Sequence, residues 1–323
     1  MRCLPPGVRM RQTSVTQLFE RLGERLQLSH VSGSLDGTLA VTEARTWPAD
    51  LVGHLSLIHP DRCQVLGAAE VAWARRQSRD KIAHHVREIL SAHPPAVIVA
   101  DGCDVPDILI RRCQEQDVAV FTTPQPAASI IDQLRLYLSR ELAERTSLHG
   151  VFMDVLGLGV FITGDSGAGK SELALELISR GHGLVADDMV EFSCIAPTVL
   201  EGRCPALLKN FLEVRGIGIL NVQTIFGETA CRRKMRLKLV VYLQRHQPGD
   251  RDPDRLPDGS DHQEILGVRI PKVVLPVAAG RNIAVLLEAA VRARILQLRG
   301  IDSTRDFIAR QSAQLSRNTP PEA

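Results

Sequence analysis

Short apolar runs and longer amphipathic stretches alternate through residues 14–121. Residues 80–93 repeat their apolar side chains at helical spacing, which predicts a helix with one buried face. The apolar runs at 94–102 and 118–124 predict strands, and residues 105–117 between them predict a second helix. Because strand–helix–strand order is typical of a parallel sheet covered by helices, we predict an α/β fold for this part of the chain.

A polar stretch with two prolines, residues 122–129, interrupts this pattern, and we interpret it as a linker. An amphipathic helix is predicted directly after it, at 130–145. A chain of 323 residues is also longer than a single domain usually is. We therefore expect an N-terminal α/β domain in residues 1–128, with residues 1–12 disordered, and a second domain in residues 129–323.

The sequence GDSGAGKS at 164–171 fits G-x-x-x-x-G-K-[ST], the phosphate loop of nucleoside-triphosphate enzymes. An apolar strand is predicted before it and an amphipathic helix after it, ending at Gly181. Glycines let backbone N–H groups approach a polyphosphate, the lysine brings positive charge to it, and the serine hydroxyl is a ligand for Mg²⁺. A glycine-rich turn that matched the motif by chance would not need a strand before it and a helix after it. The predicted nucleotide-binding residues are Gly164, Asp165, Ser166, Gly167, Ala168, Gly169, Lys170 and Ser171.

Two adjacent acids lie downstream of this loop, in the stretch 184–192, which we interpret as an apolar strand ending in Asp187 and Asp188. Such a pair can divide the work of a phosphoryl-transfer site. One carboxylate can hold the metal shell, and the other can accept the proton of an attacking hydroxyl. A β-turn with solvated aspartates is the alternative, and the phosphate loop just upstream favours the functional interpretation.

Glu213 and Arg215 flank one residue, so on an extended strand both side chains share a face. A carboxylate beside an arginine and two glycines, Gly216 and Gly218, suits a metal–phosphate site, although a surface ion pair before a glycine turn has the same pattern. The spacing leaves open whether His149 reaches the phosphates or caps a strand. Arg255, in a polar insertion, has by itself the pattern of a solvated loop charge.

Composition narrows the classes of function. The chain is 44% hydrophobic and 24% charged, which is typical of a globular protein with a buried core. A formal net charge of +2 gives no argument for nucleic acid as the main partner. Seven cysteines without a C-x-x-C pair favour a reducing cytoplasm over a disulfide framework. No run of about 18 apolar residues occurs, so no membrane span is predicted.

Several segments together resemble the bacterial HPr kinase/phosphorylase family, and LEVRGIGILNV in particular is close to a signature of that family. The matching segments are SLHGV (147–151), GDSGAGKSE (164–172), RGHGLVADDMVE (180–191), FLEVRGIGILNVQTIFG (211–227), DRL (254–256), IPKVVLPV (270–277) and GRNIAV (280–285).

This resemblance implies a phosphate-loop catalytic domain similar to that of phosphoenolpyruvate carboxykinase, in residues 129–323. It implies a kinase that uses ATP and Mg²⁺ to phosphorylate a serine of HPr, a small carrier protein of the sugar phosphotransferase system. The reverse reaction uses inorganic phosphate and releases pyrophosphate. The resemblance also implies a homo-oligomer, usually a hexamer, and an N-terminal domain similar to one in muramoyl-peptide ligases.

The resemblance also assigns roles to residues. Ser171 and Glu213 match the Mg²⁺ positions, and His149, Lys170, Asp188 and Arg255 match the active-site positions. Asp188 is expected to accept a proton in kinase action and to donate it in the reverse reaction, with Asp187 as a metal-shell or structural partner. The segment matched to both reactions comprises Leu212, Glu213, Val214, Arg215, Gly216, Ile217, Gly218, Ile219, Leu220 and Asn221. The segment matched to dephosphorylation comprises Pro276, Val277, Ala278, Ala279, Gly280 and Arg281.

The chain departs from the family at this last segment, which usually reads PVRPGR and here reads PVAAGR. Alanine replaces arginine at position 278, so we expect weakened dephosphorylation and intact kinase activity. Two other classes use the same loop. A small-molecule kinase or carboxykinase would lack the LEVRGIGILNV segment, and a non-catalytic ATP-dependent switch would not need the aspartate pair.

Overall fold

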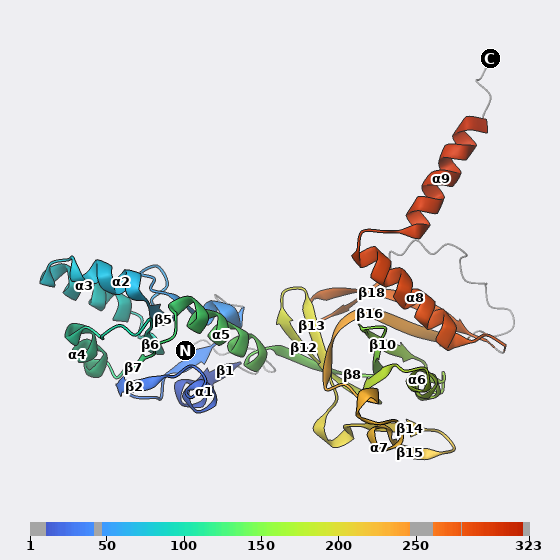
Figure 1. Cartoon of the computed structure of the whole chain (residues 1–323), viewed down its shortest axis with the longest axis horizontal. Coiled ribbons are helices and arrows are strands. Elements are labelled where there is room, and N and C mark those ends of the chain that lie inside the picture. Colours follow the sequence, from blue (N-terminus) through green and yellow to red (C-terminus); the bar gives the residue numbers. More distant parts are fainter. Residues whose placement is uncertain (1–10, 42–46, 246–260, 279, 319–323) are drawn as a thin grey trace, which may run out of the picture. The chain divides into compact units, whose positions relative to one another are not determined.

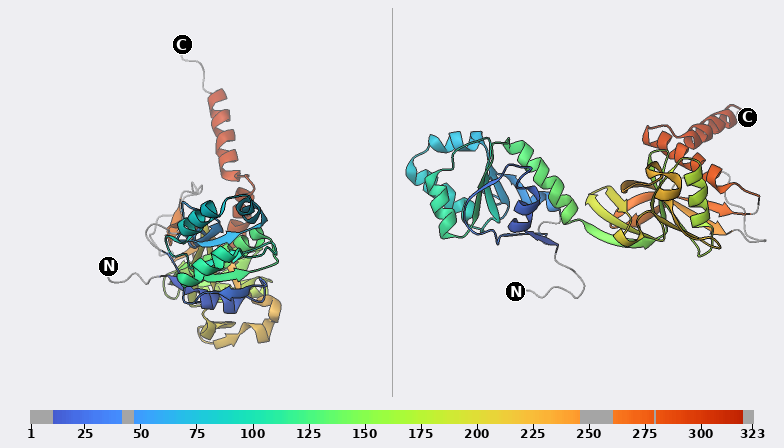
Figure 2. Two further views of the ribbon diagram at one scale, coloured as in Figure 1. Left: turned by 90° about the vertical axis from the view of Figure 1, so that its left-hand side faces the viewer. Right: turned by 60° about the horizontal axis from the view of Figure 1, so that its bottom comes forward.

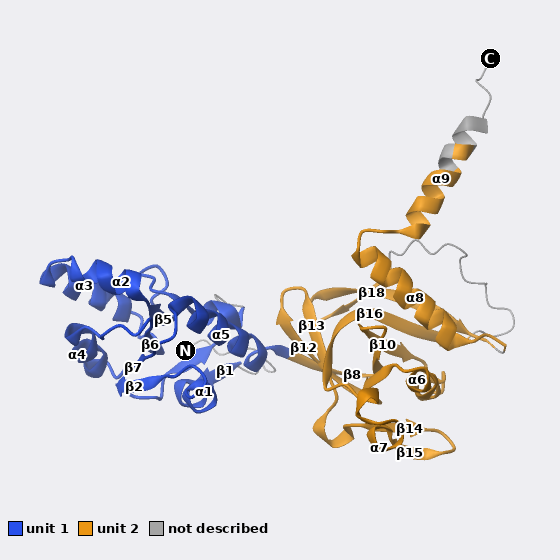
Figure 3. Ribbon diagram, viewed as in Figure 1, with its two compact units in different colours: residues 1–144 blue, residues 145–323 orange. Residues whose placement is uncertain are grey.

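The structure, a computed structural model, describes residues 11–41, 47–245, 261–278 and 280–318. The chain forms two compact units, unit 1 (Met1–Glu144) and unit 2 (Arg145–Ala323), coloured separately in Figure 3. Both units combine helices with a β-sheet, so the predicted α/β class is confirmed. The segment predicted to be disordered lies outside the described residues except at its end, where β1 (Gln12–Ser14) begins.

Unit 1 is built on a five-stranded sheet in the order β2-β7-β6-β5-β4 (Figure 1). Four strands run parallel, and the edge strand β2 is antiparallel to its neighbour β7. The strands predicted at 94–102 and 118–124 are β6 and β7 of this parallel set. The bounds are β2 (Ser29–Ser32), β4 (Val52–His54), β5 (Cys63–Leu66), β6 (Ala96–Val99) and β7 (Ala119–Thr122).

Helices cover both faces of this sheet, as the right-hand view of Figure 2 shows. Alternate side chains of β6 enter different cores: Ile98 packs with α1 and α5, whereas Val97 and Val99 pack with α2, α3 and α4. The helices are α1 (Val15–Leu22), α2 (Ala68–Arg75), α3 (Arg79–Leu90), α4 (Asp107–Glu115) and α5 (Ala127–Glu141). The short elements β3 (Thr38–Ala40) and η1 (Pro48–Leu51) complete the unit.

The boundary between the units differs from the one expected at 128/129. Helix α5, which the sequence places in the second domain, packs its buried residues Ile130, Leu134 and Leu138 into the core of unit 1. The division therefore falls after Glu144, at the end of the helix and not at its start.

Unit 2 is built on a nine-stranded sheet whose centre is formed by β10 (Leu158–Gly164), β16 (Lys234–Arg245) and β18 (Val268–Val277). These three strands run parallel, with β16 in the middle. The carboxyl ends of parallel strands meet at one edge of a sheet, where ligands bind in open α/β folds. At this edge the phosphate loop leaves β10, Arg245 ends β16 and Val277 ends β18.

The remaining strands of the sheet extend it on both sides, in the order β11-β9-β10-β16-β13-β12-β8, while β17 pairs with β18. Their bounds are β8 (Glu144–His149), β9 (Val151–Val155), β11 (Gly183–Ala186), β12 (Met189–Ala196), β13 (Val199–Arg203) and β17 (His262–Ile265). The strand predicted to end in the two acids is β11, and the rest of the stretch 184–192 belongs to β12. Asp187 and Asp188 form the turn between them, and the N–H of Met189 donates to the carbonyl oxygen of Asp187 at 2.8 Å.

One face of the unit 2 sheet is covered by the helices α6 (Lys170–Ser179) and α8 (Ile283–Leu298) and by the hairpin of β14 (Phe211–Val214) and β15 (Gly218–Asn221). On the opposite face, the ring of Phe192 packs edge to face against the rings of Phe152 and Phe161. The distances between ring centroids are 5.4 Å to Phe152 and 5.1 Å to Phe161. The other elements are α7 (Val222–Phe226), α9 (Ser303–Asn318), η2 (Ala206–Leu208) and η3 (Glu228–Ala230).

An ion-pair cluster joins α6 to α8. Glu288 accepts two hydrogen bonds from the Arg180 guanidinium, both 2.8 Å long, and its Oε1 lies 2.9 Å from Nε2 of His182. These bonds hold the pKa of Glu288 at about 2, well below its ordinary value. The cluster thus fixes the end of the helix that follows the phosphate loop. None of the helices in the described part of the chain has the length and apolarity needed to cross a bilayer.

Candidate active site

The phosphate loop follows β10 and begins helix α6, as the motif predicts. Gly164 has a φ of +146°, and a side chain there would place its Cβ 2.4 Å from the carbonyl oxygen of Leu243 on the neighbouring strand. Gly169 precedes the helix in the left-handed region, with a φ of +85°. These two positions require glycine for different reasons, close approach and backbone conformation.

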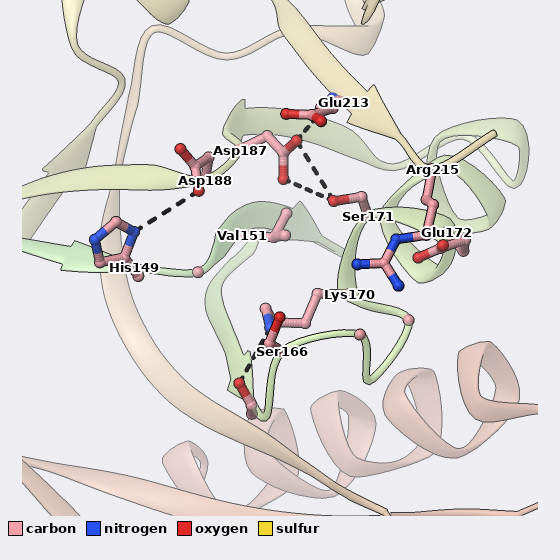
Figure 4. A pocket seen from close by; sticks show the side chains of 14 residues that line it. His149, Val151, Ser166, Lys170, Ser171, Glu172, Asp187, Asp188, Glu213 and Arg215 are labelled. Carbon is pink, nitrogen blue, oxygen red and sulfur yellow. Dashed lines mark hydrogen bonds and ion pairs between the residues drawn. The ribbon is translucent and has the colours of Figure 1, made fainter. Parts of the chain in front are cut away.

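The ammonium group of Lys170 turns back over its own loop (Figure 4). Its Nζ donates to the carbonyl oxygens of Gly164 at 3.1 Å and Asp165 at 2.9 Å. Both acceptors are uncharged, so the lysine charge stays available for an anion in the loop. This is the position that a ligand for the outer phosphates of a nucleotide requires.

Asp187 is the most buried acid of the site, with 5% of its surface exposed. Its carboxylate accepts hydrogen bonds from the Ser171 hydroxyl at 3.2 Å and from the Glu213 N–H at 2.9 Å (Figure 4). Burial raises its pKa, and the hydrogen bonds from Glu213, Asp188 and Ser171 oppose that effect. Since these partners carry no positive charge, a cation next to them would stabilise the ionised carboxylate.

Asp188 lies beside Asp187 but points to the open side of the pocket. Its Oδ1 is 3.7 Å from Nδ1 of His149, and both side chains are more than two-thirds exposed. Its backbone has a φ of +64°, in the left-handed region that aspartate tolerates better than most residues. The N–H of Gly150 donates to the Asp188 carbonyl at 3.0 Å and so ties this turn to the residue after His149.

The LEVRGIGILN segment forms the β14–β15 hairpin, which brings Glu213 and Arg215 to the same pocket. Arg215 lies in the turn of the hairpin and not on the strand as predicted, although its side chain lines the same pocket as Glu213. Leu212 and Val214 are buried in the core of unit 2. Gly216, Ile217, Gly218 and Ile219 are exposed, Leu220 and Asn221 are half-buried, and Asn221 caps α7.

These residues surround one pocket of about 500 Å³. The predicted site residues that it brings together are His149, Gly164, Ser166, Gly167, Gly169, Lys170, Ser171, Asp187, Asp188, Glu213 and Arg215. Arg255 and Ala279 lie outside the described residues. Ala168, Val277, Gly280 and Arg281 line a second hollow next to the loop.

Comparison with known proteins shows to which family the chain is related. The family model described as HPr Serine kinase N terminus matches residues 13–138, and the one described as HPr Serine kinase C-terminal domain matches residues 140–311. The chain belongs to the HPr serine kinase family. The resemblance drawn from its motifs is thereby confirmed.

Curated members of the HPr serine kinase family match over nearly their full length. A protein named HPr kinase/phosphorylase from Azoarcus sp. is 73% identical over 306 residues, which are 95% of this chain and 98% of the relative. Its namesake from Aromatoleum aromaticum is 71% identical over 313 residues, 97% of this chain and 100% of the relative. A solved structure, described as the Hpr(Ser) kinase/phosphatase from Coxiella burnetii, is 34% identical to this chain, with a TM-score of 0.45. The match covers 50% of this chain and 98% of the solved chain.

Two residues beside the loop of this HPr serine kinase family member were missed by the sequence analysis. Arg245 at the end of β16 donates to the carbonyl oxygen of Gly167, and the Tyr242 hydroxyl donates to Asp165 at 3.0 Å. The bond to Asp165 raises the pKa of Tyr242. The sequence did contain a signal for Arg245. The apolar run that ends in Arg245 has the pattern of a buried strand, and such a strand could pair with β10.

The oxygen donors of the site fit a magnesium ion that is shared with a nucleotide. Mg²⁺ in phosphoryl-transfer sites takes one or two protein carboxylates and completes its shell with phosphate oxygens and water. Ser171 offers a hydroxyl, and Asp187 and Glu213 offer carboxylates. The Asp187 carboxylate contacts the Ser171 hydroxyl and the backbone N–H of Glu213. Among the described residues, no three or more His, Cys, Asp or Glu side chains converge to hold an ion by themselves.

Proposed function

We propose that this protein is an ATP-dependent kinase that phosphorylates a serine of HPr, and that it also catalyses the reverse, phosphate-dependent dephosphorylation. The observation that carries the proposal is the convergence of Lys170, Ser171, Asp188 and Glu213 on one pocket, in a chain of the HPr serine kinase family. Its relatives at 73% and 71% identity carry the name HPr kinase/phosphorylase.

The phosphate loop holds the ATP polyphosphate. Backbone N–H groups of the loop and the first turn of α6 face the anion, and Lys170 neutralises charge on the transferred phosphoryl group. Arg215 lines the same pocket and adds a second positive charge. Most of the acceleration then comes from positioning and charge, because phosphoryl transfer needs little covalent help from the protein.

Ser171 and Glu213 would hold Mg²⁺, and Asp187 positions both of them. When bound, the ion would supply positive charge that offsets the charge developing on the transferred phosphoryl group. Asp187 accepts from the Ser171 hydroxyl and from the Glu213 N–H, so a single buried carboxylate sets the distance between the phosphate loop and the β14–β15 hairpin.

Asp188 is the base. It orients the incoming serine hydroxyl and takes its proton as the oxygen bonds to the γ-phosphorus and the bond to ADP breaks. In the reverse reaction it returns that proton to the serine oxygen while inorganic phosphate accepts the phosphoryl group and forms pyrophosphate. The exposed position of Asp188 beside His149 allows a residue on the surface of another protein to reach it.

A protein acceptor is also favoured by the surface next to the pocket. Phe211, Ile217 and Ile219 on the β14–β15 hairpin are 42%, 66% and 72% exposed. Large apolar side chains exposed next to each other are typical of surfaces that bind another protein. A small-molecule kinase has no need of such a surface outside its pocket.

The proposal is tested by incubating the purified protein with HPr, ATP and Mg²⁺ and detecting phosphoserine by mass spectrometry. We expect HPr to be phosphorylated on serine, and the Asp188→Asn variant to bind ATP without transferring phosphate. ATP binding with no transfer to HPr by the wild-type protein would contradict the proposal and favour a regulatory switch. Light scattering of the same preparation tests the proposed hexamer, which a monomer mass at micromolar concentration would exclude.

A further inference from the structure

Two arginines from separate elements of unit 2 converge on one residue of the phosphate loop, Gly167. Arg215 comes from the turn of the β14–β15 hairpin, and Arg245 ends strand β16. A Cβ atom added to Gly167 would lie 2.6 Å from Nη2 of Arg245 and 3.5 Å from Nη1 of Arg215. Both guanidinium groups therefore lie beside the same part of the loop, and Figure 4 shows Arg215 pointing toward it.

The position of Arg245 is fixed by strand pairing and by the loop itself. In the parallel register of β10 and β16, Gly164 lies opposite Leu243, so β16 ends alongside the loop. The Arg245 guanidinium donates from Nη2 to the carbonyl oxygen of Gly167. A guanidinium has several N–H donors, and this side chain is exposed, so the other donors can serve a ligand in the loop.

Positive charge gathers at this loop without a matching carboxylate. In the described part of the chain, neither Arg215 nor Arg245 forms an ion pair with an acid, and the Lys170 ammonium contacts only carbonyl oxygens. Glu172 and Glu213 line the same pocket, but within the described ranges they pair with none of these cations. Like charges close together repel, and an anion bound between them turns that repulsion into attraction.

We propose that Arg245 is a ligand of the outermost phosphate group of ATP, the group that is transferred, and that it binds this phosphate together with Arg215. The inference rests on the proposed kinase function and adds to it a residue that no motif of the sequence assigns. The active-site arginine matched by resemblance is Arg255, which lies outside the described residues. Each guanidinium can hold a phosphate by two parallel hydrogen bonds, which a lysine cannot form.

The outer phosphate is favoured over the inner ones by the place where the arginines reach the loop. Helix α6 begins at Lys170, and backbone N–H groups at a helix N-terminus bind phosphate without any side chain. Gly167 precedes this helix, so Arg215 and Arg245 approach the loop outside the first turn of α6. In phosphoryl transfer, fixed positive charge has its largest effect at the transferred group, where charge develops.

Calorimetric titration with ATP and with ADP, both in the presence of Mg²⁺, tests the inference because ADP lacks the outermost phosphate. We expect Arg245→Gln to weaken ATP binding about tenfold and to leave ADP binding unchanged. Arg245→Lys should have an intermediate effect on ATP, since lysine keeps the charge but loses the paired hydrogen bonds. The control is Arg236→Gln, at an exposed arginine near the start of β16, which should change neither affinity.

The two nucleotides separate a contact with phosphate from a structural role. If Arg245 only holds Gly167 in place, its loss should weaken ATP and ADP binding equally, and that result would overturn the inference. Unchanged ATP affinity in a folded Arg245→Gln protein would overturn it as well. The thermal unfolding curve of each variant shows whether it folds, and if Arg245→Gln does not, the same comparison of ATP with ADP in Arg245→Lys decides.

Transfer to HPr is measured separately, so that failure of the inference can be told from failure of the proposed function. At saturating ATP we expect Arg245→Gln to transfer phosphate about 10²-fold more slowly than the wild-type protein. Weaker ATP binding in this variant alone, with no transfer to HPr by the wild-type protein, would support the phosphate contact and contradict the kinase proposal. Normal transfer and normal ATP affinity in the variant would contradict the inference and leave the kinase proposal intact. A wild-type protein that binds neither nucleotide would contradict both.

Discussion

The hydroxyl of Ser171 donates to the carboxylate of Asp187 over 3.2 Å. This contact joins the end of the phosphate-loop motif to the turn between β11 and β12, and the same carboxylate accepts the N–H of Glu213 at 2.9 Å. Asp187 is therefore a positioning residue for both proposed magnesium ligands, while Asp188, one residue on, is free to face the acceptor.

Asp187→Asn should raise the Mg²⁺ concentration needed for half-maximal HPr phosphorylation. Loss of an outer-shell partner typically weakens metal binding about 10–100-fold. The measurement is a Mg²⁺ titration of the initial rate, with Asp188→Asn as the comparison, since that change should lower the rate without moving the Mg²⁺ midpoint. An unchanged midpoint in Asp187→Asn would show that the acid has only a structural role.

Asp188→Asn should keep ATP binding and lose both the kinase and the phosphorylase reaction. Removal of a positioned base typically lowers the rate about 10²–10⁴-fold. The substitution is nearly isosteric, and asparagine also tolerates the left-handed backbone of this position. Single-turnover rates at saturating Mg²⁺ decide the assignment. If Asp187→Asn is the more damaging change under these conditions, the roles of the two acids are reversed.

Lys170→Ala should abolish phosphoryl transfer and leave the fold intact. The ammonium contacts only loop carbonyl oxygens among its described partners, so its removal leaves the core of unit 2 unchanged. The measurements are the transfer rate and the thermal unfolding curve, with Lys209→Ala as an exposed control outside the pocket. Normal transfer by a folded Lys170→Ala protein would refute the site assignment.

Glu288→Gln should destabilise unit 2 at neutral pH and matter less in acid. Because the pKa of Glu288 in the folded protein is about 2, below the ordinary 4.5, its stabilising effect is complete above about pH 4.5 and is lost as the pH falls toward 2. We expect the Tm of the unit 2 transition to fall by about 2–4 °C at pH 7. The difference in Tm between this variant and the wild-type protein should become smaller at pH 3. A difference in Tm that stays the same at both pH values would contradict the stabilising role of Glu288. An equally large difference for the exposed control Asp306→Asn would contradict it as well.

Ala278→Arg should raise phosphate-dependent dephosphorylation and change the kinase rate little. Arginine holds a phosphate dianion in a two-pronged hydrogen bond, whereas the phosphate loop binds ATP without this position. We expect half-maximal dephosphorylation at about tenfold lower phosphate concentration. Ala278→Gln is the control of similar length without charge. No gain from arginine would mean that another basic group, such as Arg215 or Arg245 beside the loop, already serves this anion.

The parts of the structure that sequence predicted best are those determined within short stretches of chain. The phosphate loop is one, because its glycines, Lys170 and Ser171 act through local backbone geometry. The strands and helices of unit 1 are another, since each has its own apolar period. A motif or a period of this kind needs no knowledge of which segments meet in the fold.

What the sequence could not show depends on pairing between distant segments. Arg245 was missed because its proximity to Gly167 follows from the parallel pairing of β10 and β16. Helix α5 was assigned to the wrong unit because its apolar face does not reveal which core covers it. The strand end at the two acids was predicted correctly, but the burial of Asp187 follows from its contacts with Ser171 and Glu213, which lie far from it in the sequence.

The parallel register of β10, β16 and β18 has a consequence for how the length of the chain can change. Gly164 lies opposite Leu243, and Arg245 lies opposite Val277, so the three strand ends share one alignment. Deleting one residue inside any of these strands would move its end by about 3.3 Å and turn the side chains beyond it to the other face. Deleting a residue from the connection between β12 and β13 would move none of these ends. Insertions and deletions that preserve the site should therefore be confined to the connections.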